Sequence, residues 1–374
     1  MKQRVSVAFT ALLLGCGAPA GAQSQSESSG TGPLSGYMEM HLNRPEHGPS
    51  VLDLHRFVLL FSHRFSDRIR FVGEVEIEHA FVEGLEDAGE LEVEQAYLDF
   101  LISRPFNVRA GMVLVPIGII NERHEPPVFQ GVERPFVDTV IVPTTWFEVG
   151  AGVHGEIGRG LRYRGYVLAP LNALEFSAHD GIREGRQKGA ESNVRNVAVA
   201  GRLEYLAIRG LQVGVSGWQG ESSFAVPRLD TTIWLAEADA RYRLGRAELR
   251  AQYAHVGISD AARLNEAIER TTGVSPNVAR QLRGFYAEAA YKVWNRGPAR
   301  DLDLFARYEN FDTQFRMPAG FTALAEFDRT AWIAGATYYP DPDVAVKIDY
   351  TTVDSRSGFV RLPKSLNVGI GWWF

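Results

Sequence analysis

Cysteine and long apolar runs are what this sequence of 374 residues has least of. Its single cysteine, Cys16, excludes the disulfide framework on which small secreted domains depend. No stretch reaches the roughly 18 consecutive apolar residues that a transmembrane helix requires. If the chain enters a membrane, the remaining solution is a closed β-barrel, because lipid offers backbone groups no hydrogen-bond partner.

Lysine and chemical motifs are also scarce. Of the 39 basic side chains, five are lysine and 34 are arginine, and the formal net charge is −6. This acidic balance argues against a nucleic-acid-binding surface, which concentrates Lys and Arg. The nine histidines show no spacing suited to zinc, and we find no Gly-rich phosphate loop and no nucleophile signature. We therefore predict no catalytic residue, no metal site and no cofactor.

Residues 1–22 have the pattern of a secretory signal peptide. Lys2 and Arg4 form the positively charged start, and an apolar run too short to span a bilayer follows. An A-x-A cleavage site ends at Ala22. We expect export of the chain and cleavage near Ala22.

Cys16 allows a second interpretation of this end of the chain. With the two leucines and the glycine before it, Cys16 resembles a lipoprotein box, which would make it a lipidated N-terminus. In either case residues 23–34 have the composition of a flexible periplasmic leader. We expect a single barrel domain to follow over residues 35–374.

From residue 35 onward, segments of about 9 to 14 residues alternate apolar with polar side chains, as transmembrane strands do. The clearest are 68–79 and 364–374. We predict an all-β fold, a transmembrane antiparallel β-barrel of about sixteen strands, with eighteen as the alternative. The strands are expected at 35–41, 53–65, 68–80, 90–101, 106–116, 146–157, 161–173, 194–206, 211–219, 231–244, 246–256, 281–293, 300–311, 328–339, 343–353 and 364–374.

The connections between these strands alternate in length. Every second connection is short, such as 66–67 and 340–342, and those between are generally longer. Gram-negative barrels have short periplasmic turns and long external loops, so an even number of strands puts both termini in the periplasm. A soluble β-sandwich does not readily give sixteen strands with this rhythm. In one long connection, residues 260–268 predict a short helix capped by Asp260.

The end of the chain resembles the last strand of the Gram-negative porins. Ile370, Trp372 and Phe374 alternate on one face of that strand. In the porins, a terminal aromatic residue preceded by alternating apolar residues is the insertion signal that the barrel-assembly machinery reads. The resemblance implies this role for Ile370, Trp372 and Phe374.

More narrowly, the chain resembles a divergent relative of the phosphate-selective porin O and P family. The likeness lies in residues 54–81, in Gln95 to Phe100, and in the strand 106–116 with the loop after it. Those porins line their pore with an arginine ladder and lysine clusters. Only four lysines follow the leader here, so the resemblance does not by itself imply phosphate selectivity.

Sixteen strands enclose an aqueous channel, so inward side chains should be polar. Acidic and basic residues share the polar faces of the predicted strands and neither sign dominates, which makes ion pairing between neighbouring strands the simplest reading of most of them. We assign ten arginines to the pore wall: Arg68, Arg70, Arg109, Arg162, Arg164, Arg202, Arg241, Arg243, Arg250 and Arg307.

The longest connection, 117–145, is expected to fold into the lumen and narrow it, as the third loop of general porins does. Its four prolines limit its freedom, so it can hold a shape without strand pairing. Charges facing wall arginines such as Arg109, Arg162 and Arg164 would then sort solutes by size and charge. A loop lying over the outer surface is the alternative. The constriction residues we predict are Glu122, Arg123, His124, Glu125, Glu133, Arg134 and Asp138.

Together these features predict a porin, a passive diffusion channel for small hydrophilic solutes and ions in the outer membrane. The alternative is a substrate-specific channel for anions such as phosphate or small organic acids, which an uninterrupted arginine track would mark. An outer-membrane enzyme would need a Ser/His pair on adjacent strands, and we identify none. The expected partners are outer-membrane lipid and lipopolysaccharide, the barrel-assembly machinery, the solutes and two further copies in a homotrimer, but no nucleic acid.

Overall fold

The computed structural model describes residues 34–79, 89–222, 229, 231–295, 300–358, 360 and 362–374. The expected signal peptide and the leader up to residue 33 lie outside the described residues. Among the described residues, no helix is long and apolar enough to cross a membrane.

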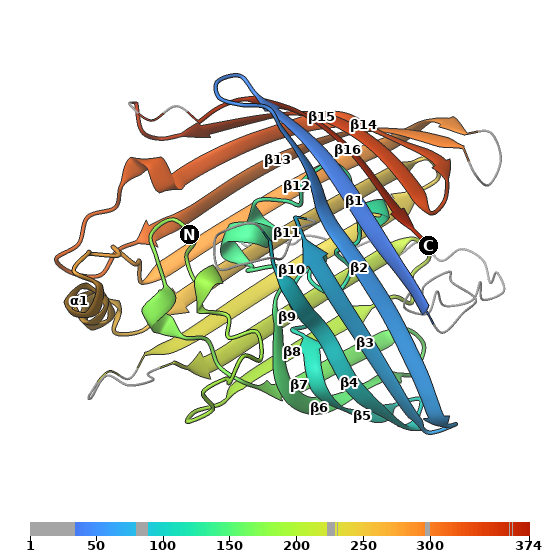
Figure 1. The fold of residues 1–374 in the computed structure, drawn as a ribbon, viewed down its shortest axis with the longest axis horizontal. Coiled ribbons are helices and arrows are strands. Elements are labelled where there is room, and N and C mark those ends of the chain that lie inside the picture. The colour runs from blue at the N-terminus through green and yellow to red at the C-terminus, as the bar shows by residue number, and fades with distance from the viewer. Residues whose placement is uncertain are drawn as a thin grey trace, which may run out of the picture.

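Sixteen strands of the described chain close into one antiparallel barrel (Figure 1). Each strand pairs with its neighbours in sequence, and the first pairs with the last. This confirms the predicted fold class and the lower of the two strand counts. The strands are β1 (Leu34–Pro45), β2 (Val51–Ser66), β3 (Ile69–Glu78), β4 (Leu91–Ser103), β5 (Phe106–Leu114), β6 (Phe147–Ile157), β7 (Leu161–Leu168), β8 (Ala198–Tyr205), β9 (Leu211–Glu221), β10 (Thr232–Leu244), β11 (Ala247–Ile258), β12 (Gln281–Asn295), β13 (Asp301–Arg316), β14 (Asp328–Asp341), β15 (Val344–Ser355) and β16 (Ser365–Trp373).

The alternation in the sequence separates an inner from an outer face. Along β15, Val346, Ile348 and Tyr350 are exposed, whereas Lys347 and Asp349 between them are buried inside the ring. The same holds around the barrel, because successive side chains of a strand point to opposite faces. The outer face therefore carries a belt of exposed apolar side chains, which includes Val149, Val167, Val199, Leu203, Val215, Trp234, Leu249, Tyr253, Phe285, Leu304, Trp332, Ile348 and Leu366.

The two ends of the barrel differ as the loop lengths predict. At the short-turn end, adjacent strands are joined by tight connections such as Gly245–Arg246, where Gly245 has φ +58° and so takes a left-handed conformation that favours glycine. At the long-loop end, the connections carry the helix α1 (Ala261–Thr272) and the short helical turns η1 (Pro126–Val128), η2 (Val137–Ile141), η3 (Ala173–Glu175), η4 (Arg183–Gly185) and η5 (Ala325–Phe327).

Two local predictions need correction. The strand expected at 161–173 ends at Leu168, just before a segment that contains Pro170 and cannot continue a ladder. The helix expected at 260–268 is present as α1, but Asp260 does not cap it. The Asp260 backbone is left-handed with φ +49°, and its side chain makes no capping hydrogen bond.

The end of the chain closes the ring. The backbone N–H of Phe374 donates to the Gly36 carbonyl (2.9 Å), and the Gly36 N–H donates to the Phe374 carbonyl (3.0 Å). The Phe374 ring stacks on Phe57 of β2, with 6.0 Å between ring centroids. Ile370 and Trp372 precede it on β16, in register with Met40 and Met38 of β1.

Candidate functional site: the inner loop and the lumen wall

Residues 117–145, which we call the inner loop, connect β5 to β6 and lie inside the ring of strands (Figure 1). The two helical turns of the loop contact the barrel wall, and η2 also contacts η4 of the β7–β8 connection, from which Arg183 donates to the Thr139 carbonyl (3.2 Å). The turn η1 contacts β1, β15 and β16, whereas η2 contacts β11, β12 and β13. The two turns thus approach the wall at different parts of the circumference.

The first part of the inner loop is held by charged groups of the wall. Arg164 of β7 donates to Glu122 (Nη1–Oε2, 2.9 Å). The His124 ring lies 3.2 Å from the Glu94 carboxylate of β4 (Nε2–Oε2), and Arg56 of β2 donates to the His124 carbonyl (3.3 Å). Burial disfavours a charged His124, but the Glu94 carboxylate outweighs it and raises the pKa of His124 to about 9. The contact is therefore an ion pair at neutral pH.

The middle of the inner loop is bound on both sides of the seam between β1 and β16. The Val132 N–H donates to the Asp349 carboxylate of β15 (2.7 Å). Glu133 accepts a hydrogen bond from Asn43 of β1 (3.1 Å) and lies 3.2 Å from Nδ1 of His41.

Glycines on β16 make room for this part of the loop. A β-carbon at Gly371 would lie 2.8 Å from Cγ of Pro126, and one at Gly369 would lie 3.0 Å from Cγ1 of Val132. The first separation is shorter than real β-carbons tolerate, and the second is tighter than nine in ten of their contacts. The inner face of β16 is therefore shaped for the loop that packs on it.

The turn η2 packs further around the ring, against β11, β12 and β13. The Val137 N–H donates to the Glu309 carboxylate of β13 (3.0 Å), and Gln252 of β11 donates to Asp138 (2.7 Å). A β-carbon at Gly284 of β12 would lie 3.1 Å from Val137. Burial above all, and the nearby Glu309 carboxylate, raise the pKa of Asp138 to about 7, although the Gln252 hydrogen bond opposes the shift.

The other predicted constriction residues do not bond to the wall in the same way. Arg134 donates to Thr145 within the loop (Nη1–Oγ1, 2.9 Å). Arg123 and Glu125 are partly buried, and burial raises the pKa of the Glu125 carboxyl. The seven residues therefore divide into wall anchors (Glu122, His124, Glu133 and Asp138) and residues that stay within the loop or near it.

The lumen wall is less polar than the sequence predicts. Towards the long-loop end, Trp218, Ile233, Leu235, Val256 and Leu282 are buried, and they form one apolar cluster with Val137 and Ile141 of the inner loop. The expectation of a polar inner face fails here because these side chains face packed protein and not water.

The ten predicted wall arginines fall into three groups. Five are buried, and each pairs with carboxylates of its own strand or of a strand one or two positions away: Arg109, Arg164, Arg202, Arg250 and Arg307. Three more are partly exposed and line the wall nearer the short turns: Arg70, Arg162 and Arg241. Two lie at the rim: Arg243 is half exposed, and Arg68 lies in the β2–β3 turn because β3 begins one residue later than predicted.

Of the three arginines expected to face the loop, Arg164 pairs with Glu122. Arg109 instead pairs with Asp99 of β4 through two hydrogen bonds (2.7 and 2.9 Å), and its guanidinium lies 3.9 Å from the centre of the Tyr97 ring. Arg162 lies 3.9 Å from Glu156. Ion pairs thus connect neighbouring strands of the wall, as the mixed charges of the sequence predict.

A cavity of about 220 Å³ opens inside β5, β6 and β7, towards the short-turn end. Four arginines and one glutamate contribute the formal charges, and Arg104 donates to Glu156 (2.7 Å). Arg104 and His154 were not predicted as site residues, since Arg104 belongs to a turn and His154 carries no local motif. The cavity is lined by Arg104, Asn107, Arg109, His154, Gly155, Glu156, Arg162, Tyr163, Arg164 and Tyr166.

This architecture is the fold of the outer-membrane porins. OmpF of Salmonella typhi superimposes with a TM-score of 0.61 at 15% identity, covering 91% of this chain and 97% of that one. The channel DcaP of Acinetobacter baumannii gives 0.61 at 12% identity, covering 91% and 96%. The anion-selective porin of Comamonas acidovorans gives 0.58 at 12% identity, covering 91% and 98%.

The family is shown by sequence. An uncharacterized protein of Aquifex aeolicus (strain VF5) is 34% identical over 338 residues, which are 86% of this chain and 76% of that protein. The chain belongs to the same family as this protein. It matches no established protein-family profile.

Proposed function

We propose that this protein is an outer-membrane porin through which small hydrophilic solutes and ions diffuse passively, with the inner loop as its constriction. The observation that carries the proposal is the path of the loop, which is bonded to β4 and β7 at one place and to β13 and β15 at others. A ring of sixteen strands is wide enough for an aqueous channel, and such a loop narrows it. The apolar outer belt suits a barrel surrounded by lipid.

The proposal includes a location and an orientation. The signal peptide would direct export, and Ile370, Trp372 and Phe374 would be read by the barrel-assembly machinery. The long-loop end would then face outward, towards lipopolysaccharide, and the short turns the periplasm. A homotrimer is part of the proposal, and OmpT of Vibrio cholerae, which shares the fold, is described in a trimer form.

Planar-bilayer recording of the purified protein tests the channel. We expect ion-permeable steps of small conductance, because the loop and the apolar cluster fill part of the lumen. Deleting residues 122–138 should raise the conductance several-fold. Deleting residues 319–323 between β13 and β14, which are exposed except for the half-buried Phe321, is the control and should leave it unchanged.

Two results would overturn the proposal in different ways. A protein that gives no ion-permeable steps at any potential, while its circular dichroism shows a folded barrel, is not a channel. A folded 122–138 deletion with wild-type conductance would show a channel whose constriction lies elsewhere.

Anion preference is a second candidate function, and the charges of the cavity favour it. Arg109 and Arg164 are paired with Asp99 and Glu122 just outside the lining, whereas Arg104 and Arg162 share the single carboxylate of Glu156. This excess of arginine over carboxylate makes the passage beside β5–β7 attractive to anions. In a salt gradient, the reversal potential should indicate preference for chloride, and the double variant Arg104→Gln/Arg162→Gln should shift it towards cations. An identical reversal potential in the variant would remove the cavity as the selective element.

A further inference from the structure

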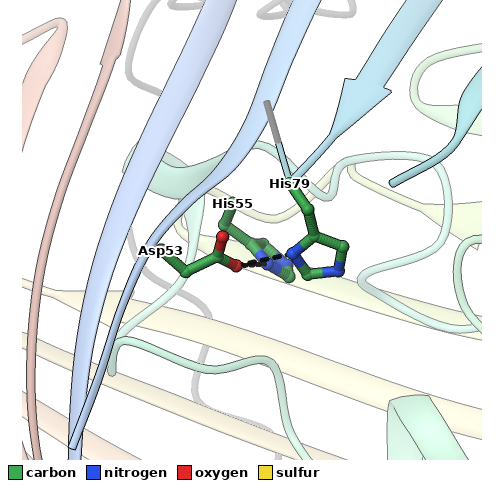
Figure 2. A group of neighbouring side chains, drawn as sticks. All are labelled: Asp53, His55 and His79. Atoms are coloured by element: carbon green, nitrogen blue, oxygen red, sulfur yellow. Dashed lines mark hydrogen bonds and ion pairs between the residues drawn. The ribbon is translucent and has the colours of Figure 1, made fainter. Parts of the chain in front are cut away.

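Asp53, His55 and His79 meet at the long-loop end of the barrel, outside the contacts of the inner loop. Nδ1 of His79 lies 2.7 Å and Nδ1 of His55 lies 3.2 Å from the same oxygen, Oδ2 of Asp53. Figure 2 shows both imidazole rings turned towards the Asp53 carboxylate. One nitrogen from each ring and one carboxylate oxygen all lie within 4.8 Å of one another.

Two departures from regular strand geometry bring these side chains together. The register between β1 and β2 shifts between the pairs Glu39–Arg56 and His41–Asp53, so β2 carries one extra residue there. Such a bulge redirects side chains, and bulges are frequent next to functional sites. His55 lies in this bulge, and its ring stacks on His41 with 4.7 Å between centroids.

The second departure is at His79, one residue beyond β3. Its φ is +56°, a left-handed conformation that is uncommon for a residue other than glycine. Its N–H donates to the His55 carbonyl (3.0 Å), which continues the ladder by one bond, while the side chain turns to Asp53. An unfavourable conformation that is kept at a cluster of ligand-type side chains indicates a functional site.

We propose that Asp53, His55 and His79 form a binding site for a divalent transition metal ion of the zinc class at the long-loop mouth of the barrel. Two imidazole nitrogens and one carboxylate oxygen are a ligand set that Zn²⁺, Ni²⁺ and Cu²⁺ accept, whereas Mg²⁺ and Ca²⁺ prefer oxygen ligands alone.

The geometry accepts such an ion after small rotations of the two imidazole rings. Bonds of about 2.0–2.2 Å place neighbouring ligand atoms of a tetrahedral zinc site about 3.3 Å apart. The separations of 2.7 and 3.2 Å from Asp53 require an opening of about 0.6 Å at His79 and about 0.1 Å at His55. The two imidazole nitrogens, which lie within 4.8 Å of each other, must reach the same separation, and rotation of the rings would bring them to it. The side chains of Asp53, His55 and His79 are 24, 29 and 47% exposed, which leaves room for water or a solute as a fourth ligand.

His41 supports the site without serving as a ligand. Its Nε2 lies 3.2 Å from Glu39 and its Nδ1 lies 3.2 Å from Glu133 of the inner loop, so both ring nitrogens already have partners. The stacked His41 ring fixes the plane of His55.

Isothermal titration of the purified full-length protein, after removal of metal with EDTA, tests the proposal. We expect one Zn²⁺ per chain, and Mg²⁺ should not compete. His55→Ala and His79→Ala should each weaken Zn²⁺ binding at least tenfold. The matched control is His63→Ala, an exposed histidine on the same strand outside the cluster, and it should bind as the wild type does.

Cobalt provides a second readout. Co²⁺ bound by these ligands should give the visible absorption bands of a four- or five-coordinate ion, and the double variant His55→Ala/His79→Ala should lose them. Equal affinity for Mg²⁺, or Zn²⁺ binding that survives in the folded double variant, would overturn the assignment. The second result would place the ion elsewhere on the chain.

Discussion

Arg307 of β13 is the guanidinium that ties the inner loop to the wall most completely. It is 1% exposed, and Nε donates to Glu309 (2.8 Å) while Nη1 lies 3.2 Å from Glu288. It also donates to two backbone carbonyls of the inner loop, those of Gln130 (3.2 Å) and Glu133 (3.4 Å). Arg307→Met keeps much of the volume and removes every one of these bonds.

The size of the effect follows from what the substitution leaves behind. The buried Glu309 carboxylate loses its counter-charge, Glu288 keeps only Arg250 (3.7 Å), and two loop carbonyls lose their donor. Removing one partner of a buried ion pair costs about 3–5 kcal/mol. If this cost weakens the docking of the inner loop on the wall, the ratio of undocked to docked loop rises by roughly two to four orders of magnitude, because about 1.4 kcal/mol corresponds to a factor of ten.

Single-channel recording and limited proteolysis measure this change together. We expect Arg307→Met to show a higher or fluctuating conductance and faster cleavage within residues 117–145. Arg243→Met is the control, since Arg243 is half exposed and pairs with Glu248 near the short turns. If Arg307→Met forms a barrel with wild-type conductance and wild-type cleavage, the guanidinium does not hold the loop and our reasoning fails.

Two more perturbations address the same loop. Gly371→Val would place a side chain against Pro126. We therefore expect a displaced inner loop, a changed conductance and a lower thermal unfolding midpoint. An unchanged midpoint would contradict the close packing of Pro126 on Gly371. The pKa of Asp138 is raised to about 7 in the folded state, whereas the unfolded chain releases this proton near pH 4. The free energy of unfolding therefore falls as the pH rises from about 4 to about 7, by up to about 1.4 kcal/mol per pH unit. Asp138→Asn should flatten this dependence and raise the unfolding midpoint at pH 8 but not at pH 4, and a wild-type pH profile in the variant would refute the assignment.

The barrel can be predicted from the sequence because the alternation that defines each strand involves residues close together in the chain. Alternation with a period of two, as along Val346 to Tyr350, records which side of each strand faces lipid, and the loop lengths record which end each strand approaches. Errors of a few residues occur where a strand leaves the ring, as at Leu168, since the alternation continues for some residues beyond the hydrogen bonds.

The interior is less readable because its contacts join residues far apart in sequence. Nothing local to Asp349 or Gln252 indicates that their partners are Val132 and Asp138, and the apolar inner face near Ile233 is explained only once the loop is in place. The histidine cluster shows the same limit. His55 and His79 are 24 positions apart and meet through a bulge and a left-handed residue, neither of which has a motif.

The inner loop has a mechanical consequence for the barrel. A hollow ring of strands is held only by the hydrogen bonds between neighbouring strands. These bonds resist sliding of one strand along the next better than they resist bending of the whole ring, so uneven pressure from the membrane flattens the ring easily. Here the loop joins β4 and β7 to β13 and β15 across the interior, so it acts as an internal brace. The cross-section of this barrel should therefore depend less on bilayer thickness and lateral pressure than that of a ring with an empty interior.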